Sequence, residues 1–286
     1  MLRIYLILIS GIIIVSSSSI LIRWTGDVPF TVISFYRVFI SFCLLLFYSI
    51  SKPGFKTKSL LKWHWHYILA GFFLAAHFIT WIASLQLTSI AHSIFLESMH
   101  PLFGVLVSII FLGESPRRSI FPAFVLAALG MFIIVYADLN HQGSQLSGDI
   151  LAIISALCLA LYLMIARKHK GEQDFIKYLI YIYGAASVFC AIYIVINGNP
   201  VWGYSKESWI FILLLAVGPN LIGHSILNWS SRQIQIFKVN LVMMLEPVLA
   251  TLSGIFFISE FPHATFYPGA GLILISLWFL IKKEGG

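Results

Sequence analysis

The sequence has little charge. Asp, Glu, Lys and Arg make up 10% of its 286 residues, whereas soluble domains carry about 25%. It also lacks the polarity of a disordered chain, because 59% of the residues are apolar and the mean hydropathy is +0.94. The composition excludes a soluble globular domain and favours a membrane protein with no sizeable domain outside the bilayer.

Cysteine is scarce, and the known sequence signatures of enzymes are absent. Cys43, Cys158 and Cys190 lie in apolar runs without CxxC spacing, which excludes a disulfide-stapled module and predicts buried core residues. HExxH, GxSxG, P-loop and dinucleotide-binding motifs are missing. We therefore expect no enzyme, no cofactor and no metal. The net charge of +7 comes from basic residues scattered through short loops, so no nucleic-acid partner is expected.

Long apolar runs fill nearly the whole chain. Breaks at charged or Pro/Gly clusters divide it into ten segments, each close to the roughly 20 residues of a bilayer-spanning helix. Alternating segments of strand length are absent. The sequence predicts an all-α integral membrane protein with ten transmembrane helices. They cover residues 3–22, 30–50, 66–86, 91–112, 119–137, 148–166, 175–196, 208–229, 238–258 and 266–281.

Basic residues collect on one side of this pattern. If the N-terminus is cytoplasmic, 15 of the 18 Lys and Arg fall on the cytoplasmic side and two, Arg23 and Lys206, fall on the other. Loops with excess Lys and Arg stay in the cytoplasm. We expect a multi-pass protein of the cell (inner or plasma) membrane with both termini in the cytoplasm.

The fourth and ninth segments resemble each other. Pro101 and Pro247 are 146 residues apart, and so are Glu114 and Glu260. A repeat at one offset predicts two related halves. Because each half holds five spans, an odd number, the halves should have opposite orientations in the membrane, as in many secondary transporters.

The chain resembles a known family. Its motifs are Ile33-Ser34-Phe35-Tyr36-Arg37 and the Pro-x12-Glu ends of the fourth and ninth spans, and the five-plus-five layout agrees. These features resemble EamA-type members of the drug/metabolite transporter superfamily. The second half departs slightly, with Ile258-Ser259-Glu260 in place of Leu-Gly-Glu. The resemblance implies two inverted five-helix repeats, at 1–138 and 148–286, around a central cavity that moves small metabolites, often amino acids and commonly outward.

Three ionisable residues lie inside predicted spans: Arg37, Glu97 and Glu246. A charge at mid-bilayer costs at least about 2.5–3.5 kcal/mol, so such residues face a cavity or a partner. Pro101 removes the hydrogen bond to the carbonyl of Glu97, and Pro247 directly follows Glu246. We predict a helix kink at each proline, and we expect the carboxylates to bind a substrate amino group or to carry a proton.

Other charged residues suggest gates. Glu114 and Glu260 mark helix ends, and we expect them, with Arg37, to act in gating or ion pairing. For Arg37 a role as substrate ligand stays open, and Glu97 is an alternative ion partner for it.

Polar and aromatic residues complete the candidate substrate site. His77 and Trp81 share a helix face at i, i+4, and His224 and Asn228 repeat that spacing. Trp81 offers a π-face to a cationic or aromatic substrate; interhelical hydrogen bonding is the alternative role. The remaining candidates are Ser18, Tyr162 and Asn240.

Together these features predict a secondary active transporter of small metabolites that exports by alternating access. The alternatives are a cation or drug efflux pump of the same fold and, less favoured, a membrane sensor or an intramembrane enzyme. The expected partners are a small-molecule substrate and the lipid bilayer, with protons as an alternative coupling partner. A monomer is favoured because the two halves supply both sides of a pathway.

Overall fold

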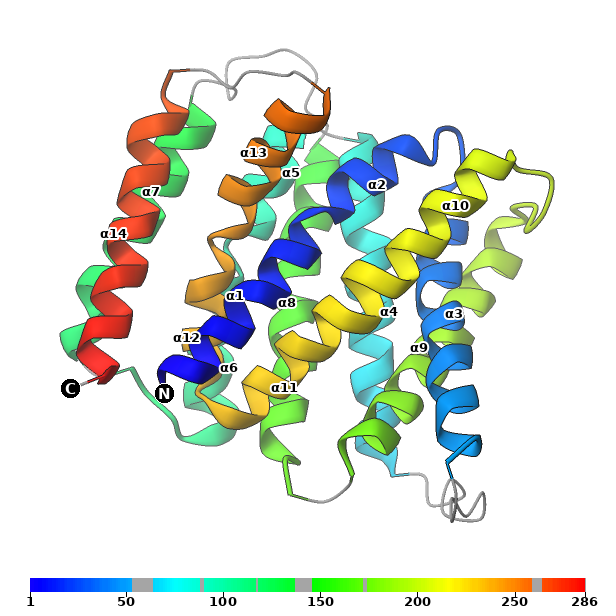
Figure 1. Cartoon of the computed structure of the whole chain (residues 1–286), viewed down its shortest axis with the longest axis horizontal. Helices are drawn as coiled ribbons and strands as arrows, with labels where there is room; N and C mark the ends of the chain where they lie inside the picture. The colour runs from blue at the N-terminus through cyan, green and yellow to red at the C-terminus, as the bar shows by residue number, and fades with distance from the viewer. Residues whose placement is uncertain are drawn as a thin grey trace.

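A computed structural model describes residues 1–52, 64–87, 90–116, 118–136, 146–171, 174–258 and 264–285. All regular structure in these ranges is helical (Figure 1), so the all-helical prediction is confirmed. An apolar chain in lipid must satisfy its backbone polar groups within each segment, and a helix does so.

Seven helical stretches are long and apolar enough to cross a membrane: Leu2–Trp24, Phe30–Ile50, Trp65–Leu87, Leu146–Lys168, Phe175–Asn197, Lys206–Gln233 and Ile236–Phe257. Three shorter apolar helices are His100–Leu112, Arg118–Ile134 and Phe266–Lys282. Each of the ten predicted segments overlaps one of these. The inverted five-plus-five arrangement stays a prediction.

In the first half of the chain the elements are α1 (Leu2–Ser16), α2 (Ser18–Trp24), α3 (Phe30–Ile50), α4 (Trp65–Leu87), α5 (Ile90–Glu97), α6 (His100–Val107), η2 (Ser108–Leu112), η3 (Arg118–Ile120) and α7 (Phe121–Tyr136). The second half holds α8 (Leu146–Lys168), α9 (Phe175–Asn197), α10 (Lys206–Leu215), η4 (Ala216–His224), α11 (Ser225–Gln233), α12 (Ile236–Met243), α13 (Glu246–Ile258) and α14 (Phe266–Gly285).

Polarity in this bundle is inverted relative to a soluble protein. Large apolar side chains point outward, with Phe47 73% and Phe256 81% exposed, whereas Arg37, Asn228 and Asn240 are fully buried. Lipid solvates the outer apolar surface, and buried polar groups bond across helices or face a cavity. The function is therefore expected in the core of the bundle.

Helix α4 packs against both α8 and α9, and α3 packs on α9. The pair α7 and α14 lies side by side at one edge of the bundle (Figure 1). Their backbones approach closely because Gly130 and Gly269 face each other; a Cβ on Gly130 would lie 2.5 Å from the carbonyl oxygen of Gly269. Small residues allow such close packing between membrane helices.

Several central helices are interrupted. The first span breaks at Ser17, where the Ser16 and Ser17 hydroxyls donate to carbonyls three residues back and compete with the helical pattern. The fourth span breaks between α5 and α6, and the ninth between α12 and α13. The π-helical η4 contains Pro219. Interrupted membrane helices usually line a cavity, where their freed backbone groups are used.

Both ends of the chain lie at the same end of the bundle (Figure 1). Several basic residues lie at or near helix termini: Arg3 in α1, Arg167 and Lys168 in α8, Arg232 in α11 and Lys282 in α14. The side of the membrane that this end faces stays a prediction.

Candidate functional site

A small cavity lies between the helices in the core of the bundle. Its wall comes from α1, α2, α4, α5, α8, η4, α12 and α13, and therefore from both halves of the chain. The lining residues are Val15, Ser18, His77, Trp81, Glu97, Leu159, His224, Met243 and Glu246. Six of the nine residues that the sequence predicts as substrate ligands are brought together here.

Two carboxylates face this cavity from helix interruptions. Glu97 is the last residue of α5 and is 9% exposed, while Glu246 is the first residue of α13 and half-buried. They interact electrostatically. Since proline has no N–H, Pro101 leaves the carbonyl of Glu97 without its helical donor, and Pro247 does the same for Met243. Among the described lining residues there is no Lys or Arg, so the wall favours a positively charged group.

The two histidines lie on adjoining walls. The centroids of the His77 and His224 rings are 6.0 Å apart. His77 Nδ1 hydrogen-bonds to the hydroxyl of Ser155 on α8 at 2.8 Å, which links the first half to the second. The His77 ring lies parallel to Trp81, with centroids 6.2 Å apart and planes within 4°. His77 is thereby fixed in orientation, and it presents a flat aromatic wall together with Trp81.

Three predicted ligands do not line the cavity. Tyr162 and Asn228 are fully buried, and the side chains of Tyr162 and Tyr178 approach that of Asn228. The amide of Asn240 donates to the carbonyl oxygen of His100 at 3.1 Å. These residues link α8, α9 and α11, and α6 to α12. For Asn228, interhelical contact is the alternative role that the sequence left open, and Tyr162 and Asn240 also contact neighbouring helices.

Arg37 lies outside the cavity wall. It is fully buried, its Cζ atom sits 3.7 Å from the centroid of the Phe78 ring, and it interacts electrostatically with Glu246. Its three guanidinium nitrogens have no hydrogen-bond partner in the described part of the chain.

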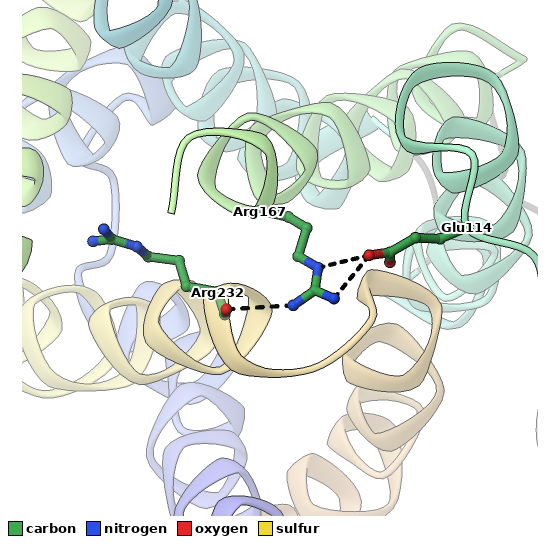
Figure 2. Close-up of polar contacts among 3 residues, drawn as sticks. All are labelled: Glu114, Arg167 and Arg232. Atoms are coloured by element: carbon green, nitrogen blue, oxygen red, sulfur yellow. Dashed lines mark hydrogen bonds and ion pairs between the residues drawn. The ribbon is translucent and has the colours of Figure 1, made fainter. Parts of the chain in front are cut away.

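Glu114 forms an ion pair that joins the two halves, as Figure 2 shows. Its Oε1 accepts from Arg167 Nη2 at 2.8 Å and from Arg167 Nε at 3.1 Å. Arg167 also donates to the carbonyl oxygen of Arg232 at 3.3 Å. The side chains of Arg167 and Glu114 are 12% and 24% exposed, so the pair is partly shielded from water. Glu260 lies outside the described residues.

Some lining residues were not predicted. Val15, Leu159 and Met243 are apolar residues in apolar spans and carry no sequence signal. Ser155, which bonds to His77 without lining the cavity, was not predicted either, because a single serine in a span is common. The pairing of Arg167 with Glu114 had a usable signal, since both are charged residues at span ends.

Comparison with known proteins gives the family. The sequence profile of the EamA-like transporter family matches residues 2–136 and 146–282. The chain belongs to this family. It is thus a transporter and not an enzyme, as the sequence predicts. A solved crystal structure with 18% identity superposes with a TM-score of 0.83 over 99% of both chains, which shows that the fold is shared.

Several transporters are similar in sequence to this EamA-like transporter. An uncharacterized transporter of Archaeoglobus fulgidus is 23% identical over 92% of this chain and 90% of its own. The S-adenosylmethionine uptake transporter of Rickettsia conorii is 23% identical over 88% and 83%. The threonine/homoserine exporter RhtA of Salmonella typhimurium is 27% identical over 55% of each chain.

Proposed function

We propose that the protein is a secondary active transporter that exports small metabolites, amino acids or related compounds, across the cell (inner or plasma) membrane. The observation that carries the proposal is one buried cavity faced by two carboxylates from interrupted helices of different halves. Negative charge on these carboxylates favours binding of a cationic substrate group, because the described wall contains no Lys or Arg.

The wall residues have distinct proposed roles. Glu97 and Glu246 bind a substrate amino group or carry a proton, and Ser18 adds a hydroxyl. His77 and His224 adjust the charge of the cavity. Trp81 contacts the apolar part of the substrate. Tyr162, Asn228 and Asn240 act indirectly by holding the helices that carry the wall.

The transport cycle proposed here is alternating access. Two inverted five-helix repeats rock around the cavity, with the prolines Pro101 and Pro247 at the interruptions. The ion pair of Glu114 with Arg167 holds the halves together, and Arg167 is among the basic residues that the positive-inside rule assigns to the cytoplasmic side. Glu260 has the corresponding proposed role in the second half of the chain. In this cycle a single chain suffices.

The relatives support the substrate class. S-adenosylmethionine, threonine and homoserine, which the names of two relatives specify, share an α-amino acid group. One relative is an uptake transporter and the other is an exporter, so the relatives include both directions of transport. Export is our proposal for this chain.

Efflux of organic cations is the second candidate. It is favoured by a wall that combines two carboxylates with the ring of Trp81, because aromatic faces attract cations. Competition by quaternary ammonium compounds would favour this alternative.

Counterflow in proteoliposomes tests the proposal. Liposomes are loaded with amino acids, nucleosides, vitamins and organic cations, and their contents are followed by mass spectrometry against protein-free liposomes. Selective exchange of amino acids supports the proposal. Exchange confined to organic cations supports the second candidate, and no exchange by folded protein overturns both.

A further inference from the structure

The guanidinium of Arg37 has no acceptor in the described part of the chain. The residue is 0% exposed, and Nε, Nη1 and Nη2 all lack hydrogen-bond partners there. Ion pairing among the described residues does not involve it either. Buried charges are normally paired, because their removal from water is strongly unfavourable. An acceptor from outside the chain would complete this group.

Several polar groups on the helices around Arg37 bond to one another, although Oδ1 of Asn220 has no partner among the described residues. The hydroxyl of Ser41 donates to the carbonyl oxygens of Arg37 and Ala216, both at 2.8 Å, and accepts from the amide nitrogen of Asn220 at 2.8 Å. Tyr183 donates its hydroxyl to the carbonyl oxygen of Asn220 at 3.1 Å. This network holds α3, α9 and η4 together, and none of its described members bonds to the guanidinium.

The ring of Phe78 lies between Arg37 and the wall residue His224. The Cζ atom of Arg37 is 3.7 Å from the centroid of the Phe78 ring. Phe78 in turn packs edge-on against His224, with centroids 4.8 Å apart, and His224 lines the cavity. The guanidinium also interacts electrostatically with Glu246, a wall carboxylate. Contact between Arg37 and a substrate in the cavity therefore requires the Phe78 and His224 rings to move aside.

We propose that Arg37 binds the carboxylate of a zwitterionic substrate whose ammonium group is bound by Glu246 and Glu97. This inference rests on the proposed function and narrows its substrate class to compounds with an α-amino acid group. The guanidinium fork matches a carboxylate with two parallel hydrogen bonds. An α-amino acid carries its ammonium and its carboxylate on one carbon atom, so it needs an anionic and a cationic side chain close to each other. Glu246 and Arg37 interact electrostatically and meet this requirement.

This role separates the two candidate functions. A quaternary ammonium compound would meet the carboxylates and leave Arg37 without a partner. A zwitterion would satisfy all three charged side chains. The carboxylate should therefore improve apparent affinity about 10- to 100-fold, as expected for one charge-assisted interaction.

The test compares free amino acids with their methyl esters. Leucine, methionine, threonine and tryptophan, each with its methyl ester, are used as competitors in proteoliposome counterflow below neutral pH, where the ester keeps its ammonium. Wild-type protein should prefer the free acid of at least one pair about 10- to 100-fold. Arg37→Gln should abolish that preference by weakening the acid alone, and Arg37→Lys should retain part of it.

Lys52→Gln is the matched control. Lys52 follows α3 and lies 4.4 Å above the ring of Tyr48, but it is exposed. This variant should keep the wild-type preference. Thermal unfolding establishes that each variant is folded, and if Arg37→Gln is not, Arg37→Lys must still show a smaller acid-over-ester ratio than wild type.

The remaining outcomes overturn the proposal in distinguishable ways. If wild-type protein takes esters as well as acids, or if folded Arg37→Gln weakens both equally, Arg37 does not bind the carboxylate, while the transporter proposal stands. If wild-type protein moves organic cations but no amino acid, the proposed function fails together with this inference.

Discussion

The two interrupted helices at the cavity contain similar residues in different positions. In the first half, Glu97 ends α5 and the break follows it. In the second half, the break comes first and Glu246 begins α13. Pro101 and Pro247 each lie within the first two residues of the helix after the break. The carboxylates thus meet one cavity from opposite ends of their helices.

This difference makes the two carboxylates unequal. A helix N-terminus carries partial positive charge and a C-terminus partial negative charge. The anionic form of Glu246 is therefore stabilised by α13 and by Arg37, whereas that of Glu97 is opposed by the end of α5. Glu97 is also the more buried of the two. Similar positions in a repeat can thus provide one well-stabilised anion and one poorly stabilised anion.

The largest expected effect follows from that inequality. Glu246→Gln should weaken transport of amine-bearing substrates about 10- to 100-fold, since a charge-assisted interaction is lost. Glu97→Gln should have an effect about two- to fivefold smaller, as expected from a helix-dipole difference of about 0.3–1 kcal/mol. Initial rates of counterflow over a range of substrate concentrations measure both. Equal losses, or a larger loss in Glu97→Gln, would contradict the inequality.

Helices α6 and α12, which lie beside the two breaks, pack against each other. A Cβ on Gly104 of α6 would clash with the Asn240 amide of α12, whereas one on Gly271 of α14 would meet nothing within 4 Å. Gly104→Ala should destabilise the fold by about 1–3 kcal/mol through overpacking. The unfolding temperature in detergent measures this. Gly271→Ala is the matched control, and equal stability of the two variants would refute close packing at the crossing.

Glu114 lies just after the fourth span and forms an ion pair with Arg167. Removing one partner of the ion pair in Glu114→Gln should cost about 1–2 kcal/mol, between the values for exposed and buried pairs. A double-mutant cycle with Arg167→Gln, read by unfolding temperature, should show coupling between the two sites. Lys168→Gln removes a neighbouring exposed charge and should be silent. Additive effects of Glu114→Gln and Arg167→Gln would mean that the pair does not tie the halves together.

The two cavity histidines differ in their hydrogen bonds, and the smallest effect is expected there. His77 bonds to Ser155, whereas His224 Nδ1 has no partner among the described residues. Ser155→Ala should destabilise the protein by about 0.5–1.5 kcal/mol, because it removes the hydroxyl partner of a buried ring nitrogen and leaves only the 3.3 Å contact with the carbonyl oxygen of residue 155. Ser187→Ala, which removes a bond within α9, serves as control for thermal unfolding. A Ser155→Ala variant more stable than Ser187→Ala would contradict a restraining role.

Apolar run length predicted the helices well, because helices are the structures that satisfy backbone groups in lipid. Glu97 and Glu246 could be found because ionised groups are rare within spans. The sequence did not predict the break at Ser17 or the π-helical turn that ends at His224. Both depend on local competition for backbone hydrogen bonds, which runs of serine and a proline only suggest.

Polar residues in the spans were harder to assign. Ser18 and Tyr162 have corresponding positions in the two halves, yet Ser18 lines the cavity and Tyr162 lies among buried tyrosines. A few degrees of helix rotation separate a wall residue from an interhelical contact, and apolar spans carry little periodicity to fix that rotation.

The most direct test of the central claim is counterflow by the double variant Glu97→Gln/Glu246→Gln. Each change is isosteric, so the cavity keeps its shape while its charge is removed. We expect a folded double variant, with the thermal unfolding profile of wild type, to lose transport of every amine-bearing substrate that wild type exchanges. Transport at the wild-type rate by that variant would contradict the claim that these two carboxylates form the substrate site.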